Sequence, residues 1–297
     1  MEVNTLPSAN PVRAAATVVM LRDGAAGLEV FLLKRHGQSE VLGGAYVFPG
    51  GKVDARDAEL DPDSHLDASA AALLEALNEP QLDELSAIAL HVAAVREAFE
   101  ETGVLFAHGA GDSQAAAAWA LLREGRAFDE VLALMGLRLQ ASALRPWSRW
   151  ITPQVGGVMR KRFDTRFFLA PVPAGQIARH DNHEAIDSIW LAPAQALRQY
   201  WDGTLELAPP QIMSLTHLAR HASVASALAE ARHRPPPLIQ PESFELEGTR
   251  VVCYPGDARH PIAQRALPGP TRLHWRSRRF EPAGGLDELL DGIALPD

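Results

Sequence analysis

Apolar side chains recur every three or four residues between Asp83 and Gly103, which is the spacing that places them on one face of an α-helix. The stripe consists of Ile88, Val92, Val95 and Phe99. Asp83 is a favourable N-cap, and glycine is the residue that most often follows the last helical turn. The pattern therefore predicts a long amphipathic helix that begins after Asp83 and ends at Gly103.

Runs rich in β-branched and aromatic residues predict strands on both sides of this helix. Residues 14–21 and 28–34 are separated by a short segment containing glycine and aspartate, which indicates a hairpin. Further strand candidates lie at residues 163–169, 188–191, 250–254 and 272–275. Further helices are expected at residues 69–77, 113–140, 193–200 and 211–231. The chain is therefore expected to be of the mixed α and β class.

The composition is that of an ordinary folded protein, with 297 residues of which 47% are hydrophobic and 22% are charged. The net charge is −9 at pH 7, whereas general binders of nucleic acid or of anionic membranes are usually basic. We therefore expect neither nucleic acid nor a membrane as a partner. A local basic pocket for a phosphorylated ligand is compatible with this charge.

Cys253 is the only cysteine, so an intrachain disulfide and a cysteine-based zinc cluster are excluded. Its valine neighbours favour a small core residue over a nucleophile. No apolar run approaches the ~18 residues of a membrane-spanning helix, and the N-terminus shows no signal-peptide pattern. A soluble cytoplasmic protein is the expectation.

Three glutamates lie on the helix face opposite the apolar stripe, at Glu97, Glu100 and Glu101. Spacings of three and four residues make these carboxylates neighbours, and neighbouring carboxylates repel unless a cation lies among them. Mg²⁺ is the natural candidate, because it is a hard cation that takes oxygen ligands and substrate phosphates. Taken alone, the helix also fits a plain solvated face.

A glycine-rich segment at residues 43–51 precedes the helix and ends in Pro49-Gly50-Gly51, which predicts a turn. Backbone that carries no side chain can approach a phosphate or a metal ion closely. A glycine pair alone is common in ordinary turns. The loop and the helix together favour a metal site over a solvated face.

The two segments resemble the Nudix family, whose box reads G-x5-E-x7-R-E-U-x-E-E-x-G-U, with U a bulky aliphatic residue. The second half matches Arg96-Glu97-Ala98-Phe99-Glu100-Glu101-Thr102-Gly103-Val104 at every fixed position, and Ala98 is small for its place. The first half corresponds to Gly51 and, six residues later, to Asp57 in place of glutamate. Residues 58–95 fill a gap that is far shorter in the family, and about 31 residues are extra. We interpret Asp57 as structural.

This resemblance implies an α+β Nudix fold, in which a mixed β-sheet is sandwiched between helices. The Nudix domain would span residues 12–205, with an insertion at residues 58–85 inside the box. Residues 206–297 would form a C-terminal helical and β extension that packs on the same domain. A homodimer is compatible with the sequence, and the insertion could serve it as a dimer contact or act as a lid.

The resemblance also implies roles for individual residues. Mg²⁺ or Mn²⁺ would be bound by Glu97, Glu100, Glu101 and the carbonyl of Gly51. Arg96 would orient the carboxylates as part of the catalytic machinery. Glu97 and Glu184 are the candidate catalytic carboxylates. Glu97 could help to activate the attacking water, and Glu184 is a candidate because a further acidic residue often comes from a loop beyond the box.

The insertion and residues 144–153, 162–168 and 207–211 resemble the coenzyme A diphosphatases of the peroxisomal and mitochondrial type. That branch implies hydrolysis of coenzyme A or an acyl-CoA to 3′,5′-ADP and a phosphopantetheine product. The 3′-phosphate of coenzyme A favours basic groups near the site. The candidates for substrate binding are Arg35, Gly50, Arg160, Arg162 and Arg166.

Two other functions are compatible with the same box. The chain could be a Nudix pyrophosphatase for a nucleotide sugar, a dinucleotide or a modified nucleotide. It could instead be a Nudix fold that senses a ligand without turnover. Three adjacent glutamates argue against a sensing module, because ligand binding alone does not require them.

Overall fold

The computed structural model describes residues 12–39, 42–153, 161–181 and 184–291. It begins with a hairpin of β1 (Val12–Gly24) and β2 (Gly27–Arg35), which pair antiparallel from Leu21↔Val30 to Gly24↔Gly27. Both strands alternate between the two faces of the sheet and are buried over most of their length. The predicted hairpin is therefore confirmed, and it forms the centre of the main sheet.

The main sheet is mixed, as the fold prediction required. Its principal order is β3-β2-β1-β6-β5-β8, while β4 pairs with β1 and β7 pairs with β2. β1 and β6 run parallel, as do β5 and β8, and the other described pairs are antiparallel. The strands after the hairpin are β3 (Tyr46–Val47), β4 (Gly50–Lys52), β5 (Arg145–Ile151), β6 (Arg162–Pro171), β7 (Ala185–Leu191) and β8 (Leu238–Ile239).

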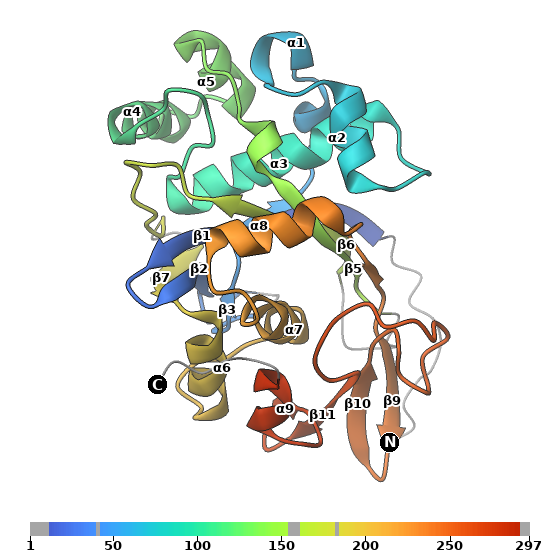
Figure 1. Cartoon of the computed structure of the whole chain (residues 1–297). Coiled ribbons are helices and arrows are strands. Elements are labelled where there is room, and N and C mark those ends of the chain that lie inside the picture. The colour runs from blue at the N-terminus through green and yellow to red at the C-terminus, as the bar shows by residue number, and fades with distance from the viewer. Residues whose placement is uncertain (1–11, 40–41, 154–160, 182–183, 292–297) are drawn as a thin grey trace.

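Helices cover both faces of this sheet (Figure 1). On one face lies α3 (Glu84–Thr102), surrounded by α1 (Pro62–His65), α2 (Ala70–Leu77), α4 (Asp112–Arg123) and α5 (Phe128–Met135). On the other face lie α6 (Pro193–Trp201), α7 (Pro209–Leu218) and α8 (Val224–His233). Two separate hydrophobic clusters fill the space between the sheet and these layers. The sheet is thus sandwiched between helices, as expected of an α+β Nudix fold.

The long helix begins and ends where the sequence predicts. The side chain of Asp83 accepts a hydrogen bond of 2.8 Å from the backbone N–H of Ser86. Gly103 ends the helix in the left-handed region at φ 69, where a side chain would also collide with Trp119. The predicted stripe of Ile88, Val92, Val95 and Phe99 is buried in the core on this face of the sheet.

The insertion at residues 58–85 folds into α1, α2 and the loop that leads into α3. Glu79, from that loop, binds two arginines of the sheet. Its carboxylate lies 2.7 Å from Nη1 of Arg149 on β5 and 2.6 Å from Nη2 of Arg166 on β6. All three side chains are largely buried. The insertion is therefore fastened to the sheet by an ion-pair network at its C-terminal end.

Two predicted helices are each divided in the structure. Residues 113–140 form α4 and α5, which are separated by a turn at Gly125. Residues 211–231 were expected to form one helix, but α7 and α8 are separated at residues 219–223. The second break is held by the hairpin, because Leu28 donates to the carbonyl of Ala222 and Val224 donates to Asp23. Ser223 then caps α8.

Beyond α8, the C-terminal extension forms a second sheet of order β12-β11-β10-β9. The strands are β9 (Glu242–Leu246), β10 (Thr249–Cys253), β11 (Arg272–Arg276) and β12 (Arg279–Glu281), and α9 (Leu286–Leu290) follows. Tyr254 and Leu273 share a hydrophobic cluster with Trp150 of the main sheet. Cys253 is fully buried, and burial raises the pKa of its thiol to about 11, as expected for a core residue.

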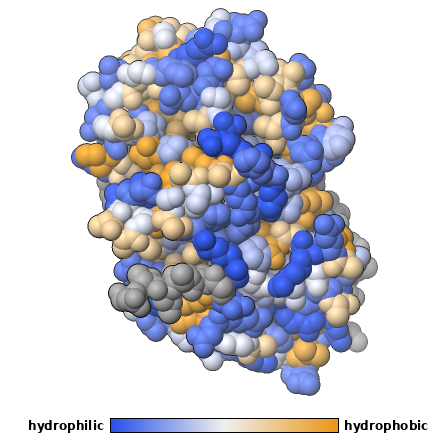
Figure 2. All heavy atoms as spheres, in the orientation of Figure 1, coloured by the Kyte–Doolittle hydropathy of each residue, from blue (hydrophilic) through white to orange (hydrophobic). Residues whose placement is uncertain are grey.

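The surface is mostly polar on the face shown in Figure 2, where apolar side chains are scattered among hydrophilic ones. No helix within the described ranges combines the length and the apolar content needed to cross a membrane. The 19-residue α3 is long enough in principle, but it has several acidic residues.

His91 is a buried ionisable group on α3. Its Nδ1 lies 2.8 Å from the carbonyl oxygen of Ala87, and its ring packs 4.9 Å from that of Phe168. Burial lowers the pKa of His91 to about 4. The folded protein therefore holds this imidazole neutral at a pH where an unfolded histidine begins to bind a proton.

We expect His91→Leu to make stability less sensitive to acid. Because the folded-state pKa is depressed, the contribution of His91 is fully present above pH ~6.5 and is lost as the pH falls towards 4. The variant should avoid about 3 kcal/mol of the loss in unfolding free energy between pH 7 and pH 4. Urea unfolding at both pH values measures this, with the exposed His233→Gln as control. Equal acid sensitivity in wild type and His91→Leu would contradict the assignment.

Candidate functional site

The C-terminal half of α3 lies against the glycine loop, as the sequence predicts. The N–H of Gly50 donates a 2.9 Å hydrogen bond to Oε2 of Glu101. Gly50 has φ 153, and a Cβ there would lie 2.4 Å from the carbonyl oxygen of Ala16. A Cβ on Gly51 would lie 2.5 Å from the carboxylate of Glu97. Glycine at position 51 therefore lets the loop approach the helix, and glycine at position 50 lets it pack against β1.

Arg96 connects the two halves of the box across the insertion. Its Nε and Nη2 donate to the two carboxylate oxygens of Asp57 at 2.8 and 2.9 Å, and Asp57 is 2% exposed. Its Nη1 donates to Glu97 at 2.9 Å and to Glu100 at 3.1 Å. Nη2 also donates to the carbonyl of Lys52, the last residue of β4. A bidentate pair of this kind fixes the plane of the guanidinium and so the position of both glutamates.

The carboxylates of this cluster are difficult to keep ionised without a cation. Burial raises the pKa of Glu97 to about 7 and that of Glu101 to about 8, partly opposed by Arg96 and by the N–H of Gly50, respectively. Burial also raises the pKa of Glu100, against the effect of Arg96. One arginine thus faces several glutamates in a desolvated place. An all-oxygen donor set with this excess of negative charge fits a hard divalent cation.

Glu184 and Arg35 are brought to the same cluster from elsewhere in the chain. The charge of Glu184 raises the pKa values of Glu97, Glu100 and Glu101. Nη2 of Arg35 lies 3.8 Å from Oε2 of Glu184, whose side chain is 60% exposed. Nε of Arg35 is buried and has no hydrogen-bond partner among the described residues. The guanidinium of Arg35 therefore lies beside the glutamates, and its Nε has an N–H that is not paired there.

Three of the predicted substrate ligands have hydrogen-bond partners within the protein. Arg162 is buried, and its Nε and Nη2 donate to the carbonyl of Thr152. Arg166 is 5% exposed, and its guanidinium is bound by Glu79 and Asp164. The N–H of Gly50 is used by Glu101. Their role as substrate ligands stays a prediction. Arg160 lies outside the described residues.

Tyr46 is a neighbour of the site that sequence reasoning missed. Its hydroxyl donates a 2.7 Å hydrogen bond to Oδ2 of Asp187 on β7. Burial and this carboxylate raise the pKa of Tyr46 to about 12. Nζ of Lys34 lies 5.7 Å from the centre of the Tyr46 ring. The position of Tyr46 beside the glycine loop was the available signal, but its partner is 141 residues away.

Comparisons with known proteins agree with this geometry. The family model described as the NUDT19 Nudix domain matches residues 7–218. The acyl-coenzyme A diphosphatase NUDT19 of Xenopus laevis is 27% identical over 280 residues, which cover 78% of this chain and 71% of that protein. The protein of the same name from Homo sapiens is 29% identical over 237 residues, covering 68% of this chain and 63% of the relative.

A solved structure supports the same assignment. The NUDIX hydrolase from Alicyclobacillus acidocaldarius superposes with a TM-score of 0.61 at 28% identity, covering 75% of this chain and 97% of that one. The matched family region contains the glycine loop, the insertion and α3 through to the end of α7. The glutamate cluster, its arginine and the fold are thus found together in one chain, which belongs to the Nudix hydrolase family and matches its NUDT19 Nudix domain.

Proposed function

We propose that this chain hydrolyses the diphosphate of coenzyme A or an acyl-CoA, releasing 3′,5′-ADP and phosphopantetheine or its acyl form. The observation that carries the proposal is the carboxylate cluster beside the glycine loop, in which Arg96 holds Glu97 and Glu100, and the N–H of Gly50 holds Glu101. The substrate class is supported by the relatives named acyl-coenzyme A diphosphatase, which match over most of this chain. It is also the substrate class that the insertion in the box predicts.

Mg²⁺ or Mn²⁺ is the proposed cofactor. Glu97, Glu100 and Glu101 would hold it, and the carbonyl of Gly51, beside Glu97, would be a further oxygen ligand. The buried carboxylates with raised pKa values support this choice, because a divalent cation removes the charge repulsion that burial makes costly. When bound, such an ion neutralises the diphosphate oxygens and lowers the cost of attack on phosphorus.

The chain's own residues would then position the reactants. Arg96 holds Glu97 and Glu100 in place through its three carboxylate contacts, and Asp57 prevents the guanidinium from turning. Glu97 and Glu184 are the proposed groups for orienting the attacking water and accepting its proton. Glu97 is fixed by Arg96, whereas Glu184 is exposed on the loop before β7. Arg35, with its unpartnered Nε, is the proposed ligand for a substrate phosphate.

A panel of diphosphate compounds tests the substrate assignment. Wild-type protein with Mg²⁺ or Mn²⁺ is given coenzyme A, an acyl-CoA, ADP-ribose, NADH and a nucleotide sugar, and products are identified by mass spectrometry. We expect kcat/KM to be highest for the coenzyme A compounds. A higher kcat/KM for any of the other compounds would overturn the substrate class and leave the Nudix assignment intact.

Three further statements remain predictions from the sequence. They are the cytoplasmic location, the homodimer and the domain boundary between residues 205 and 206. The extension shares a hydrophobic cluster with the Nudix domain, which supports the expectation that it packs on the same domain.

A further inference from the structure

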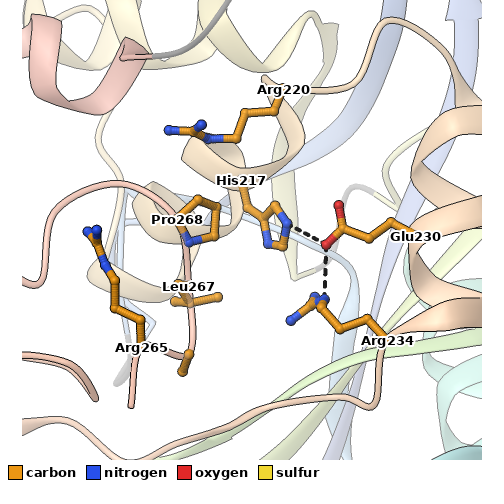
Figure 3. A pocket seen from close by; sticks show the side chains of 8 residues that line it. His217, Arg220, Glu230, Arg234, Arg265, Leu267 and Pro268 are labelled. Atoms are coloured by element: carbon orange, nitrogen blue, oxygen red, sulfur yellow. Dashed lines mark hydrogen bonds and ion pairs between the residues drawn. The ribbon is translucent and has the colours of Figure 1, made fainter. Parts of the chain in front are cut away.

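A cavity of about 400 Å³ opens between α7, α8 and the loop at residues 265–268 (Figure 3). Its lining includes His217, Arg220, Glu230, Arg234 and Arg265. His217 stacks at 4.4 Å on Trp147, which belongs to the core on the α7 face of the sheet. The catalytic candidates lie on α3, which packs on the opposite face. This cavity is therefore separate from the carboxylate cluster.

Three ligand-type side chains converge at the wall of this cavity. His217 on α7, His221 just after it and Glu230 on α8 place one nitrogen or oxygen each within 4.8 Å of one another. Nε2 of His217 lies 2.8 Å from Oε1 of Glu230, and Nε2 of His221 lies 3.1 Å from Oε2. Two imidazoles and one carboxylate form a donor set that suits Zn²⁺ and similar ions.

Hydrogen bonding does not fully account for the arrangement. Nε2 of His221 is buried and, within the described part of the chain, has no partner with hydrogen-bond geometry, although Oε2 is only 3.1 Å away. Nε2 of each histidine therefore lies close to Glu230, but only Nε2 of His217 makes a hydrogen bond with it. Neutral imidazole is the form of histidine that binds metal ions.

The surrounding contacts orient the three groups. Nδ1 of His221 lies 3.1 Å from the hydroxyl of Ser226, which fixes the ring. Nε of Arg234 lies 2.9 Å from Oε1 of Glu230, while its guanidinium rests 4.7 Å from the centre of the Trp147 ring. Contacts of this kind hold metal ligands in their binding orientation. Oε2 of Glu230 is the oxygen that Arg234 leaves for a cation.

Positive charge is the main obstacle to a cation here, because Arg220, Arg234 and Arg265 all line the cavity. Figure 3 shows Arg220 and Arg265 on the side of the cavity away from Glu230. An anion or hydroxide that enters from the cavity would offset this charge. We propose that His217, His221 and Glu230 form a second metal site, for an ion of the zinc class, whose open position faces the arginine-lined cavity.

Cobalt spectroscopy on the full chain tests this proposal. The protein is stripped of metal with a chelator and titrated with Co²⁺, whose visible absorption is strong in a four-coordinate histidine site and weak in an all-oxygen octahedral site. We expect about one equivalent of Co²⁺ to produce a strong band, and Zn²⁺ to displace it. The band should persist in Glu97→Gln and vanish in His221→Gln and in Glu230→Gln.

The experiment tests this second site separately from the proposed catalytic site. His221→Gln should keep its acyl-CoA hydrolysis, because His221 lies on the other face of the sheet from α3. Circular dichroism checks that each variant is folded. If a variant is unfolded, the Co²⁺ titration of the wild-type protein alone decides whether the second site exists. A wild-type protein that gives only the weak octahedral band, or a strong band that survives in both His221→Gln and Glu230→Gln, would overturn the second site.

Discussion

Glu97→Gln is expected to lower kcat for acyl-CoA hydrolysis by about 10²–10⁴-fold, the range typical of losing a positioned proton acceptor. The amide keeps the size of the side chain but removes a charge that Arg96 holds at 2.9 Å beside Gly51. A neutral amide is also a poorer ligand for a divalent cation. Initial rates with Mg²⁺, measured by release of 3′,5′-ADP, give the effect.

Two controls separate chemistry from folding and from binding. Glu84→Gln removes an exposed glutamate from the first turn of the same helix, and its kcat should be unchanged. Glu97→Gln should still bind the substrate, which calorimetry measures directly. A full kcat in Glu97→Gln would contradict the catalytic role. Binding without turnover in the wild type as well would favour a ligand-sensing module.

Asp57→Asn is expected to cost about 3 kcal/mol of unfolding free energy, as for other buried ion pairs that lose one partner. Asp57 is 2% exposed and accepts two hydrogen bonds from Arg96, whose side chain is 11% exposed. Once this pair is lost, the guanidinium can turn away from Glu97 and Glu100. We therefore expect kcat to fall together with stability.

Chemical unfolding and initial rates measure both effects on the same preparations. Asp63→Asn is the matched control, since Asp63 is an exposed aspartate of the insertion that follows Asp57. Its effect should stay within about 0.5 kcal/mol. If Asp57→Asn is as stable and as active as the control, then Asp57 does not hold Arg96 in its working position.

Local signals made α3 and the placement of its carboxylates predictable. The apolar stripe, the cap at Asp83 and the stop at Gly103 are all encoded within one segment, and the structure reproduces them. The carboxylate face follows from the same periodicity. The close approach of Gly50 and Gly51 to the helix is also expected from glycine alone, although the atoms that they meet are not.

Long-range pairings account for what the sequence did not show. Arg166 was a candidate phosphate ligand because its ion pair with Glu79 is not evident in the sequence. Glu79 is 87 residues away, in the insertion. Asp57 could be matched to the box, but its contact with Arg96 joins residues 39 positions apart in the sequence, with α1, α2 and the start of α3 between them. The break between α7 and α8 depends on Asp23 of the distant hairpin, whose side chain accepts a hydrogen bond from the N–H of Val224 at the start of α8. None of these contacts leaves a periodic or local trace.

The insertion is anchored to the rest of the domain at both of its ends. It enters beside Asp57, whose carboxylate is held by Arg96, and it leaves beside Glu79, which is held by two arginines of the sheet. Both ends are therefore fixed by buried ion pairs. Such anchoring lets the halves of the box meet despite the extra residues and argues against an insertion that swings as a free lid.

The most direct test of the account is a time course of an acyl-CoA with the wild-type protein at neutral pH, with both products identified by mass spectrometry. We expect equal amounts of 3′,5′-ADP and acyl-phosphopantetheine in the presence of Mg²⁺. We also expect that release stops when a chelator is added and resumes when Mg²⁺ is restored. An acyl-CoA that stays intact with folded, Mg²⁺-supplied protein, or that is cleaved at any other bond, would contradict the proposed function.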